Sequence, residues 1–213
     1  MPNKHHLTPE LIDYIEAEIL PRYDTFDKAH NRNHAITVLV KSLRLAQHYD
    51  VNTAMVYAIA AYHDLGLVEG REHHHTASAR IVREDKRLKE LFTADDIEIM
   101  AEAVEDHRAS STRAPRTIYG KIVAEADRII DPTTIMTRTI QYGLSHYPTL
   151  TAEEHIERAV THIKEKYGKE GYIKLWIPES DNATRLHGFR ALIEDKRQLI
   201  ESLQLIYDKE KQN

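Results

Sequence analysis

The chain has 213 residues, of which 41% are hydrophobic and 30% are charged, so it is long enough to bury one hydrophobic core. Its formal net charge of −5 at pH 7 argues against a basic surface for nucleic-acid polymers or anionic membranes. The absence of cysteine excludes disulfides, thiol nucleophiles and cysteine-based zinc sites. The sequence shows no signal-peptide pattern and no long apolar run, and we therefore expect a cytoplasmic protein with no membrane partner.

Helical periodicity dominates the chain, and no segment alternates between apolar and polar residues as a strand does. An all-α fold is therefore expected. Thr8 followed by Pro9 is typical of an N-cap and a first helical position, and predicts a helix that extends to about Leu20. A second helix is predicted over residues 32–49.

The third predicted helix is the most apolar one. It begins at Asn52 or Thr53, and residues 54–62 are apolar on every side, which is typical of a helix at the centre of a bundle. Gly66 fits a C-terminal cap just after it. Further helices are predicted over residues 76–86, 94–107, 117–130, 133–146, 151–167 and 182–209.

The adjacent pair His63 and Asp64 lies where this central helix is predicted to end. Both side chains can therefore reach a cavity while the helix stays packed. Imidazole and carboxylate ligands together suit divalent metals such as Mn, Fe, Co, Ni or Zn. A His-Asp dipeptide also occurs often by chance, so the pair alone does not define a site.

Asp127 is predicted to face the core, because it shares a helix face with Val123 and Ile130. Glu125 and Arg128 are expected on a different, polar face. A buried carboxylate must be paired or bound to metal, since an isolated one is costly. An ion pair with a buried arginine is the alternative to a metal at this position.

Histidines at three further places are candidate ligands. His107 follows the apolar spacing of its helix, although a core histidine can also be satisfied by a backbone carbonyl. His34 lies one turn after His30, and such a pair can chelate a metal or can be solvated at a helix start. The run of residues 73–75 is all histidine, for which a solvated loop is the alternative.

In their order along the chain, His34, the pair His63-Asp64 and Asp127 resemble the HD-domain superfamily of metal-dependent phosphohydrolases. The segments 30–34 and 74–79, together with His107, resemble one branch of it, with a His-x-x-x-His opening and a His-His-x-x-Ser-Ala motif. The resemblance implies a single all-α domain: an HD-domain helical bundle with its metal-binding core at about residues 25–132, and a helical extension at about 133–213.

The resemblance implies that His34, His63, Asp64 and Asp127 bind a divalent metal ion, which can be Mn, Fe, Co, Ni, Mg or Zn. His75 and His107 correspond to positions that complete a second metal site in dinuclear members. One or two metals per chain are therefore compatible with the sequence.

Catalytic roles follow from the same resemblance. Asp64 is the expected partner of the attacking water, and His75 or His107, when not bound to metal, can donate a proton or a hydrogen bond to the phosphate.

Basic residues near His107 are candidate contacts to a phosphate: Arg108, Arg113, Arg116 and Lys121. The alternative for each is a solvated basic loop that offsets nearby acidic residues. Of these acidic residues, Glu105 and Asp106 can position a water or a second ion, but the sequence favours solvated charges at a helix end.

The function expected from these features is a phosphatase, phosphodiesterase or pyrophosphohydrolase that acts on a small phosphorylated substrate, with nucleotides the commonest class. One alternative is a dinuclear-iron HD-type oxygenase, and another is a non-catalytic HD module that binds a nucleotide or a protein partner. A homodimer is compatible with the apolar residues Leu199, Leu203 and Ile206 on the last helix, which can equally pack within the chain.

Overall fold

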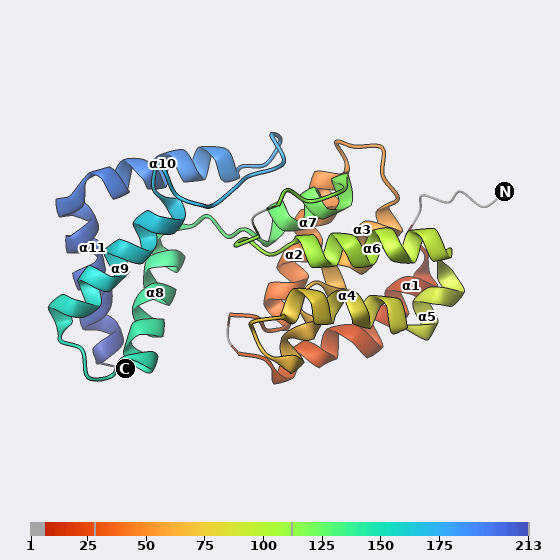
Figure 1. Cartoon of the computed structure of the whole chain (residues 1–213), viewed down its shortest axis with the longest axis horizontal. Coiled ribbons are helices and arrows are strands. Elements are labelled where there is room, and N and C mark those ends of the chain that lie inside the picture. The colour runs from red at the N-terminus through yellow and green to blue at the C-terminus, as the bar shows by residue number, and fades with distance from the viewer. Residues whose placement is uncertain (1–6, 28, 112, 213) are drawn as a thin grey trace. The chain divides into compact units, whose positions relative to one another are not determined.

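The structure is a computed structural model, and it describes residues 7–27, 29–111 and 113–212. Within these residues every regular element is a helix, which confirms the predicted all-α class (Figure 1). The chain divides into two compact units. Unit 1 contains the residues up to Arg128 together with Trp176–Ser180, and unit 2 contains Ile129–Leu175 and the residues from Asp181 onward. The expected single domain stays a prediction.

Unit 1 begins with a helix that changes its winding. Helix α1 (Pro9–Tyr14) starts where predicted, because the Thr8 side chain accepts a hydrogen bond from the Leu11 amide at 3.4 Å. The chain then continues as a π-helical turn, η1 (Ile15–Ile19), and a 3₁₀ helix, η2 (Leu20–Thr25). The first helical segment is therefore longer and less regular than the periodicity predicts.

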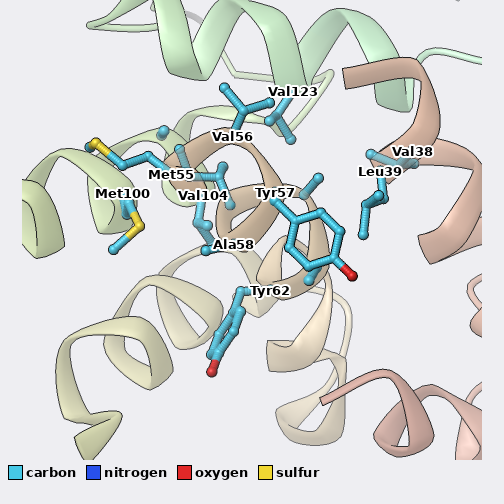
Figure 2. Packing of buried hydrophobic residues seen from close by; sticks show 14 of the residues in the cluster. Val38, Leu39, Met55, Val56, Tyr57, Ala58, Tyr62, Met100, Val104 and Val123 are labelled. Carbon is cyan, nitrogen blue, oxygen red and sulfur yellow. The ribbon is translucent and has the colours of Figure 1, made fainter. Parts of the chain in front are cut away.

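Helix α3 (Thr53–Tyr62) forms the centre of unit 1, as its apolar sequence predicts. All of its residues from Ala54 to Tyr62 are buried. It packs against α2 (Arg32–Ala46), α6 (Ala94–Asp106) and α7 (Ile118–Asp127). Figure 2 shows side chains of α3 among apolar partners from these three helices, namely Val38, Leu39, Met100, Val104 and Val123.

Side-chain caps set the limits of the next helices. Asp85 ends α4 (His74–Glu84) and begins α5 (Lys86–Leu91), where its Oδ1 accepts a hydrogen bond from the Leu88 amide at 2.9 Å. The predicted helix over 76–86 is therefore two helices with a break at the capping aspartate. The predicted start of α6 is confirmed, because Thr93 forms a capping box at its N-terminus.

Gly66 is not a helix cap, contrary to the sequence-based expectation. Gly70 is the one residue with a positive φ (99°) among the described residues, whereas Gly66 lies inside the 3₁₀ helix η3 (Leu65–Glu69). A Cβ atom on Gly66 would lie 2.5 Å from the Ser78 amide nitrogen and would also collide with the His74 carbonyl oxygen. Glycine is needed here because η3 passes directly against the first turns of α4.

Glu125 and Arg128 are buried, which corrects the expectation that they occupy a polar face of α7. The Trp176 amide donates a hydrogen bond to Glu125 Oε2 at 2.6 Å. The Arg128 guanidinium donates to the Ala124 carbonyl oxygen. Helical periodicity could not reveal this burial, because the segment Trp176–Ser180 comes from far along the chain and joins unit 1.

Unit 2 also consists of helices in the part of the chain that is described. They are α8 (Pro132–His146), α9 (Ala152–Tyr167), α10 (Asn182–Glu194) and α11 (Lys196–Lys211). The long final helix predicted over 182–209 is broken at Asp195, whose side chain accepts a hydrogen bond from the Gln198 amide at 3.0 Å and caps α11. Leu199 and Leu203 are buried within the unit. None of the described helices has the length and apolar character that crossing a bilayer requires.

Candidate metal centre

Six histidine and aspartate side chains of unit 1 form two adjoining clusters, each of three possible metal ligands. They come from five different helix ends. His34 is in the first turn of α2, His74 begins α4, and Asp127 is the last residue of α7. His63 and His107 are the C-caps of α3 and α6, and Asp64 follows His63. Side chains at helix ends can meet at one centre while the helices keep their packing.

The first cluster contains His34, His63 and Asp127. The Nε2 atoms of the two histidines are 3.2 Å apart. Asp127 Oδ1 lies 3.2 Å from His34 Nε2 and 3.9 Å from His63 Nε2. Both histidines are buried, and Asp127 is half-buried. The partner of Asp127 is therefore this histidine pair, and not the buried arginine that was its alternative.

The second cluster contains Asp64, His74 and His107. Asp64 Oδ1 lies 3.3 Å from His107 Nε2 and 3.6 Å from His74 Nε2. The Nε2 atoms of His74 and His107 are 3.3 Å apart. Asp64 and His107 are buried, whereas His74 is partly accessible.

Asp64 joins the two clusters. Its Oδ2 atom lies 3.2 Å from His63 Nε2 and 3.5 Å from His34 Nε2. Its Oδ1 atom faces the second cluster instead. One carboxylate therefore offers an oxygen to each side, which is the arrangement of a carboxylate that can bridge two cations.

Backbone carbonyls orient three of the four histidines. The Nδ1 atoms of His63, His74 and His107 donate to the carbonyl oxygens of Ala60, Arg71 and Val104 at 2.8, 2.8 and 2.5 Å. This contact places the proton on Nδ1 and leaves the Nε2 lone pair directed into the cluster. His107 thus makes the backbone contact of a core histidine and also keeps one nitrogen available as a ligand.

The two clusters fit divalent metal ions with nitrogen and oxygen ligands. The Nδ1 contacts leave the Nε2 atoms of neutral His74 and His107 unprotonated, and these two atoms repel at 3.3 Å because no hydrogen lies between their lone pairs. A cation at about 2.0–2.2 Å from each ligand would separate neighbouring ligands by roughly 3.0–3.5 Å, close to the observed values. The mixed donors favour Mn, Fe, Co, Ni or Zn over Mg, which prefers oxygen ligands.

The electrostatics of the centre favour positive charge. Burial alone would lower the pKa of His34, but hydrogen bonds to Asp127 and Asp64 raise it to about 9. Burial would raise the pKa of Asp127, yet the hydrogen bond from His34 and the charge on His63 hold it well below its ordinary value. The carboxylates therefore stay ionised and attract a proton or a metal cation.

The structure places His74 in the second cluster, whereas the family resemblance implies His75 as the ligand of a second metal. The ring of His75 lies 5.6 Å from that of His74, centroid to centroid, and its Nδ1 atom is 3.4 Å from Arg108 Nη1. Consecutive residues of a helix point about 100° apart, so only one of the two can face the cluster. Three consecutive histidines carry no signal of which one this is. A ligand role for His75 stays a prediction.

Arg113 and the acidic residues before it form an ion-pair group. The guanidinium of Arg113 lies 3.1 Å from Asp106 Oδ1 and 3.2 Å from Glu105 Oε1, and Arg116 contacts the same two carboxylates. Asp106 is buried, which corrects the expectation that it is a solvated charge at a helix end. The positive charge of Arg113 is therefore largely balanced by its neighbours.

Arg108 differs from the other arginines of this loop. Its Nη1 atom donates to the Glu72 carbonyl oxygen at 2.6 Å and its Nε atom donates to Ser110 Oγ at 2.9 Å. It forms no ion pair with a carboxylate in the described part of the chain. Lys121, the other candidate for phosphate contact, lies on α7, and its side-chain ammonium group makes no hydrogen bond or ion pair with another described residue.

Tyr23 is a site residue that the sequence analysis missed. Its hydroxyl accepts a hydrogen bond from the Asp64 amide at 3.3 Å and donates one to the Ala61 carbonyl oxygen at 2.9 Å. No motif or spacing in the sequence marks this tyrosine, because its contacts are made with residues about 40 positions away.

The described part of unit 1 is all-helical and carries two adjoining His/Asp clusters at helix ends that could hold metal ions. The family model described as HD domain matches residues 31–130. Residues 31–130 therefore form an HD domain, and members of the HD-domain superfamily bind divalent metals and are generally phosphohydrolases. No curated protein and no solved structure matches the chain significantly.

Proposed function

We propose that this chain is a metal-dependent phosphohydrolase that acts on a small phosphorylated substrate, with nucleotides as the first class to test. The observation that carries the proposal is the pair of His/Asp clusters joined by Asp64 within a chain that matches the HD domain. The bond that is cleaved can be a phosphate ester or a phosphate anhydride.

The ligand roles follow from the two clusters. His34, His63 and Asp127 would hold one cation, His74 and His107 a second, and Asp64 would contribute one oxygen to each. A divalent cation in such a site lowers the pKa of a bound water and polarises a phosphoryl oxygen. The chain's own contribution is to hold Asp64 and the Nε2 atoms in place, and to keep the buried side of the centre free of water.

The surroundings of Arg108 support the proposal that the substrate is phosphorylated. The protein partners of this arginine carry no negative charge, namely the Glu72 carbonyl oxygen, the Ser110 hydroxyl and His75 Nδ1, so they orient the guanidinium without cancelling its charge. Arg108 directly follows His107 in the chain and is therefore close to the second cluster. A guanidinium offers several donors to phosphate oxygens, and an unbalanced charge binds the phosphate more strongly than a paired one.

In this proposal His75 acts beside Arg108, at the second cluster, as a hydrogen-bond donor to the substrate. Its Nδ1 atom is 3.4 Å from Arg108 Nη1 and faces a donor, so its Nε2–H is the group left to donate a hydrogen bond. We assign His75 to the phosphate or the leaving group, and His74 to the second cluster.

One observation favours a second candidate function, a dinuclear-iron oxygenase. The two clusters together offer six ligands, four imidazoles and two carboxylates, which is the number that such an oxygenase requires. Arg108 argues for the hydrolase, because phosphate chemistry accounts for an oriented guanidinium without a carboxylate partner. Oxygen consumption by the iron-loaded protein would support the oxygenase.

The first experiment measures release of phosphate and pyrophosphate from a panel of nucleotides. Protein stripped of metal is reloaded with Mn, Co, Ni, Fe, Zn or Mg before each assay. We expect release by the wild type with one or more of these metals, and a loss of at least a hundredfold in the Asp64→Ala variant, because both clusters lose a shared ligand. Circular dichroism checks that the variant keeps its helices.

The products then identify the bond that is cleaved. Equal release by the wild type and by Asp64→Ala would contradict the proposed centre. Tight metal binding without release from any nucleotide would contradict the nucleotide hydrolase, and oxygen consumption would then be measured with iron-loaded protein.

A further inference from the structure

Tyr23 lies outside the residues that match the HD domain, yet it contacts the metal centre directly. It belongs to η2, eight residues before the match begins at residue 31. Its side chain is fully buried. Its ring stacks on the ring of His63, with centroids 6.3 Å apart and an angle of 30° between the planes. The ring of Phe26 makes an edge contact with the same Tyr23 ring, with centroids 5.4 Å apart.

The Tyr23 hydroxyl occupies the point where α3 ends. Carbonyl groups in the last turn of a helix lack partners within the helix and need other donors. The Ala61 carbonyl oxygen accepts its hydrogen bond from the Tyr23 hydroxyl, and the Ala60 carbonyl oxygen accepts one from His63 Nδ1. Two side chains therefore complete the last turn of the helix that carries the ligands.

The same hydroxyl also fixes the backbone of Asp64. At this residue the chain leaves the helix with φ −110° and ψ 5°, and its amide donates to the Tyr23 oxygen at 3.3 Å.

We propose that Tyr23 is a positioning residue for the metal ligands His63 and Asp64, so that the segment before the matched domain forms part of the metal centre. The inference rests on the proposed metal site, and it does not depend on the substrate or on the reaction. Asp64 serves both clusters, and a shift of its backbone would therefore displace a ligand of each.

The test is the Tyr23→Phe variant, which removes one hydroxyl and keeps the ring. Tyr62→Phe is the matched control, because Tyr62 is also buried, lies on α3 beside His63, and donates its hydroxyl to Asp85 Oδ2 at 2.7 Å, away from the clusters. Calorimetric titration with Co²⁺ gives the dissociation constant, the visible absorption of bound Co²⁺ reports its coordination, and thermal unfolding gives the stability of each protein.

We expect Tyr23→Phe to bind Co²⁺ about tenfold to a hundredfold more weakly than the wild type, with a changed absorption spectrum. Tyr62→Phe should unfold at a lower temperature and keep the affinity and spectrum of the wild type. Should Tyr23→Phe fail to fold, Phe26→Leu loosens the ring contact while keeping the hydroxyl, and is expected to change the Co²⁺ spectrum in the same sense.

Wild-type affinity and spectrum in Tyr23→Phe, or in Phe26→Leu where it replaces that variant, would overturn the positioning role. Equal losses in Tyr23→Phe and Tyr62→Phe would also overturn it, because stability alone would then explain both. Co²⁺ binding by the wild type without hydrolysis of any nucleotide would contradict only the proposed function. No Co²⁺ binding by the wild type would contradict both proposals.

Discussion

His63, His74 and His107 each donate Nδ1–H to the carbonyl oxygen three residues earlier in the chain. Each ring is thus held by a nearby backbone carbonyl, from the last turn of the helix for His63 and His107 and from the loop before α4 for His74, and its Nε2 atom points to the shared centre. His34 differs, because its Nδ1 atom is buried and has no hydrogen-bond partner in the described residues. At the residue scale, local backbone contacts therefore orient three ligands, while the fourth is oriented only by its packing and its partners in the cluster.

The choice between His74 and His75 is testable by metal content. His74→Ala should lower the number of bound metal ions per chain, or weaken the second ion at least tenfold, because the second cluster loses one of three ligands. His75→Ala should keep the wild-type metal content. Elemental analysis after dialysis against a defined concentration of Mn²⁺ or Co²⁺ measures both. The reverse pattern would show that His75 is the ligand, as the family resemblance implied.

Arg108→Gln should raise KM for a phosphorylated substrate about tenfold to a hundredfold, because a charge-assisted hydrogen bond contributes about 1.5–3 kcal/mol. Arg113→Gln should have a smaller effect, since the charge of Arg113 is balanced by Glu105 and Asp106. Steady-state kinetics with the nucleotide found in the panel measures both variants.

The control for the Arg108 measurement is Arg83→Gln, in which an arginine paired with Glu98 on the surface of unit 1 is replaced. It should leave KM unchanged. An equal KM in Arg108→Gln and the wild type would remove Arg108 from the substrate site.

At the element scale, the contact between η3 and α4 positions two residues of the second cluster, Asp64 and His74. The Gly66 amide donates to Ser78 Oγ at 2.7 Å, and the missing side chain of Gly66 lets η3 approach the first turns of α4. Because His74 begins α4 and Asp64 directly precedes η3, this close approach brings the two ligands together.

Gly66→Ala should destabilise the protein by about 1–3 kcal/mol, because the added Cβ collides with the backbone of α4, which cannot move aside freely. It should also weaken metal binding at the second cluster. Gly188→Ala on α10 is the matched control, since a Cβ there meets nothing within 4 Å. In a helix interior that replacement should stabilise by about 0.5–1 kcal/mol.

Urea unfolding followed by circular dichroism measures both glycine variants. A Gly66→Ala protein as stable as the wild type, with unchanged metal content, would show that η3 can shift without disturbing the site.

Several helix starts could be predicted from the sequence, whereas changes of winding and breaks inside a helical pattern could not. Helices α1, α6, α7 and α9 begin within one residue of the predicted positions, where Thr8, Thr93, Thr117 and Thr151 act as N-caps on amides within three residues of themselves. The π-helical turn after α1 has no local signal in the sequence. Asp195 caps α11, but an aspartate inside a long helical pattern does not by itself predict a break.

At the scale of the whole molecule, unit 1 includes more than the matched HD domain. The segment Trp176–Ser180 contributes Ile177 to the buried core, and Glu179 Oε2 accepts a hydrogen bond from the Tyr49 hydroxyl at 2.5 Å. The segment before residue 31 contributes Tyr23. Both flanking segments are thus part of the unit that carries the metal centre. A homodimer and a cytoplasmic location stay predictions.

The sequence by itself determined the all-α class, the buried central helix and five of the six cluster residues: His34, His63, Asp64, His107 and Asp127. The class and the central helix follow from short-range periodicity, and the five residues follow from the resemblance of their order along the chain to the HD-domain superfamily. Neither needs knowledge of tertiary contacts. Only the tertiary structure placed His74, and not His75, in the second cluster, brought Tyr23 to the centre, and buried Glu125. Each of these depends on contacts between segments far apart in the chain, for which a single sequence carries no periodic signal.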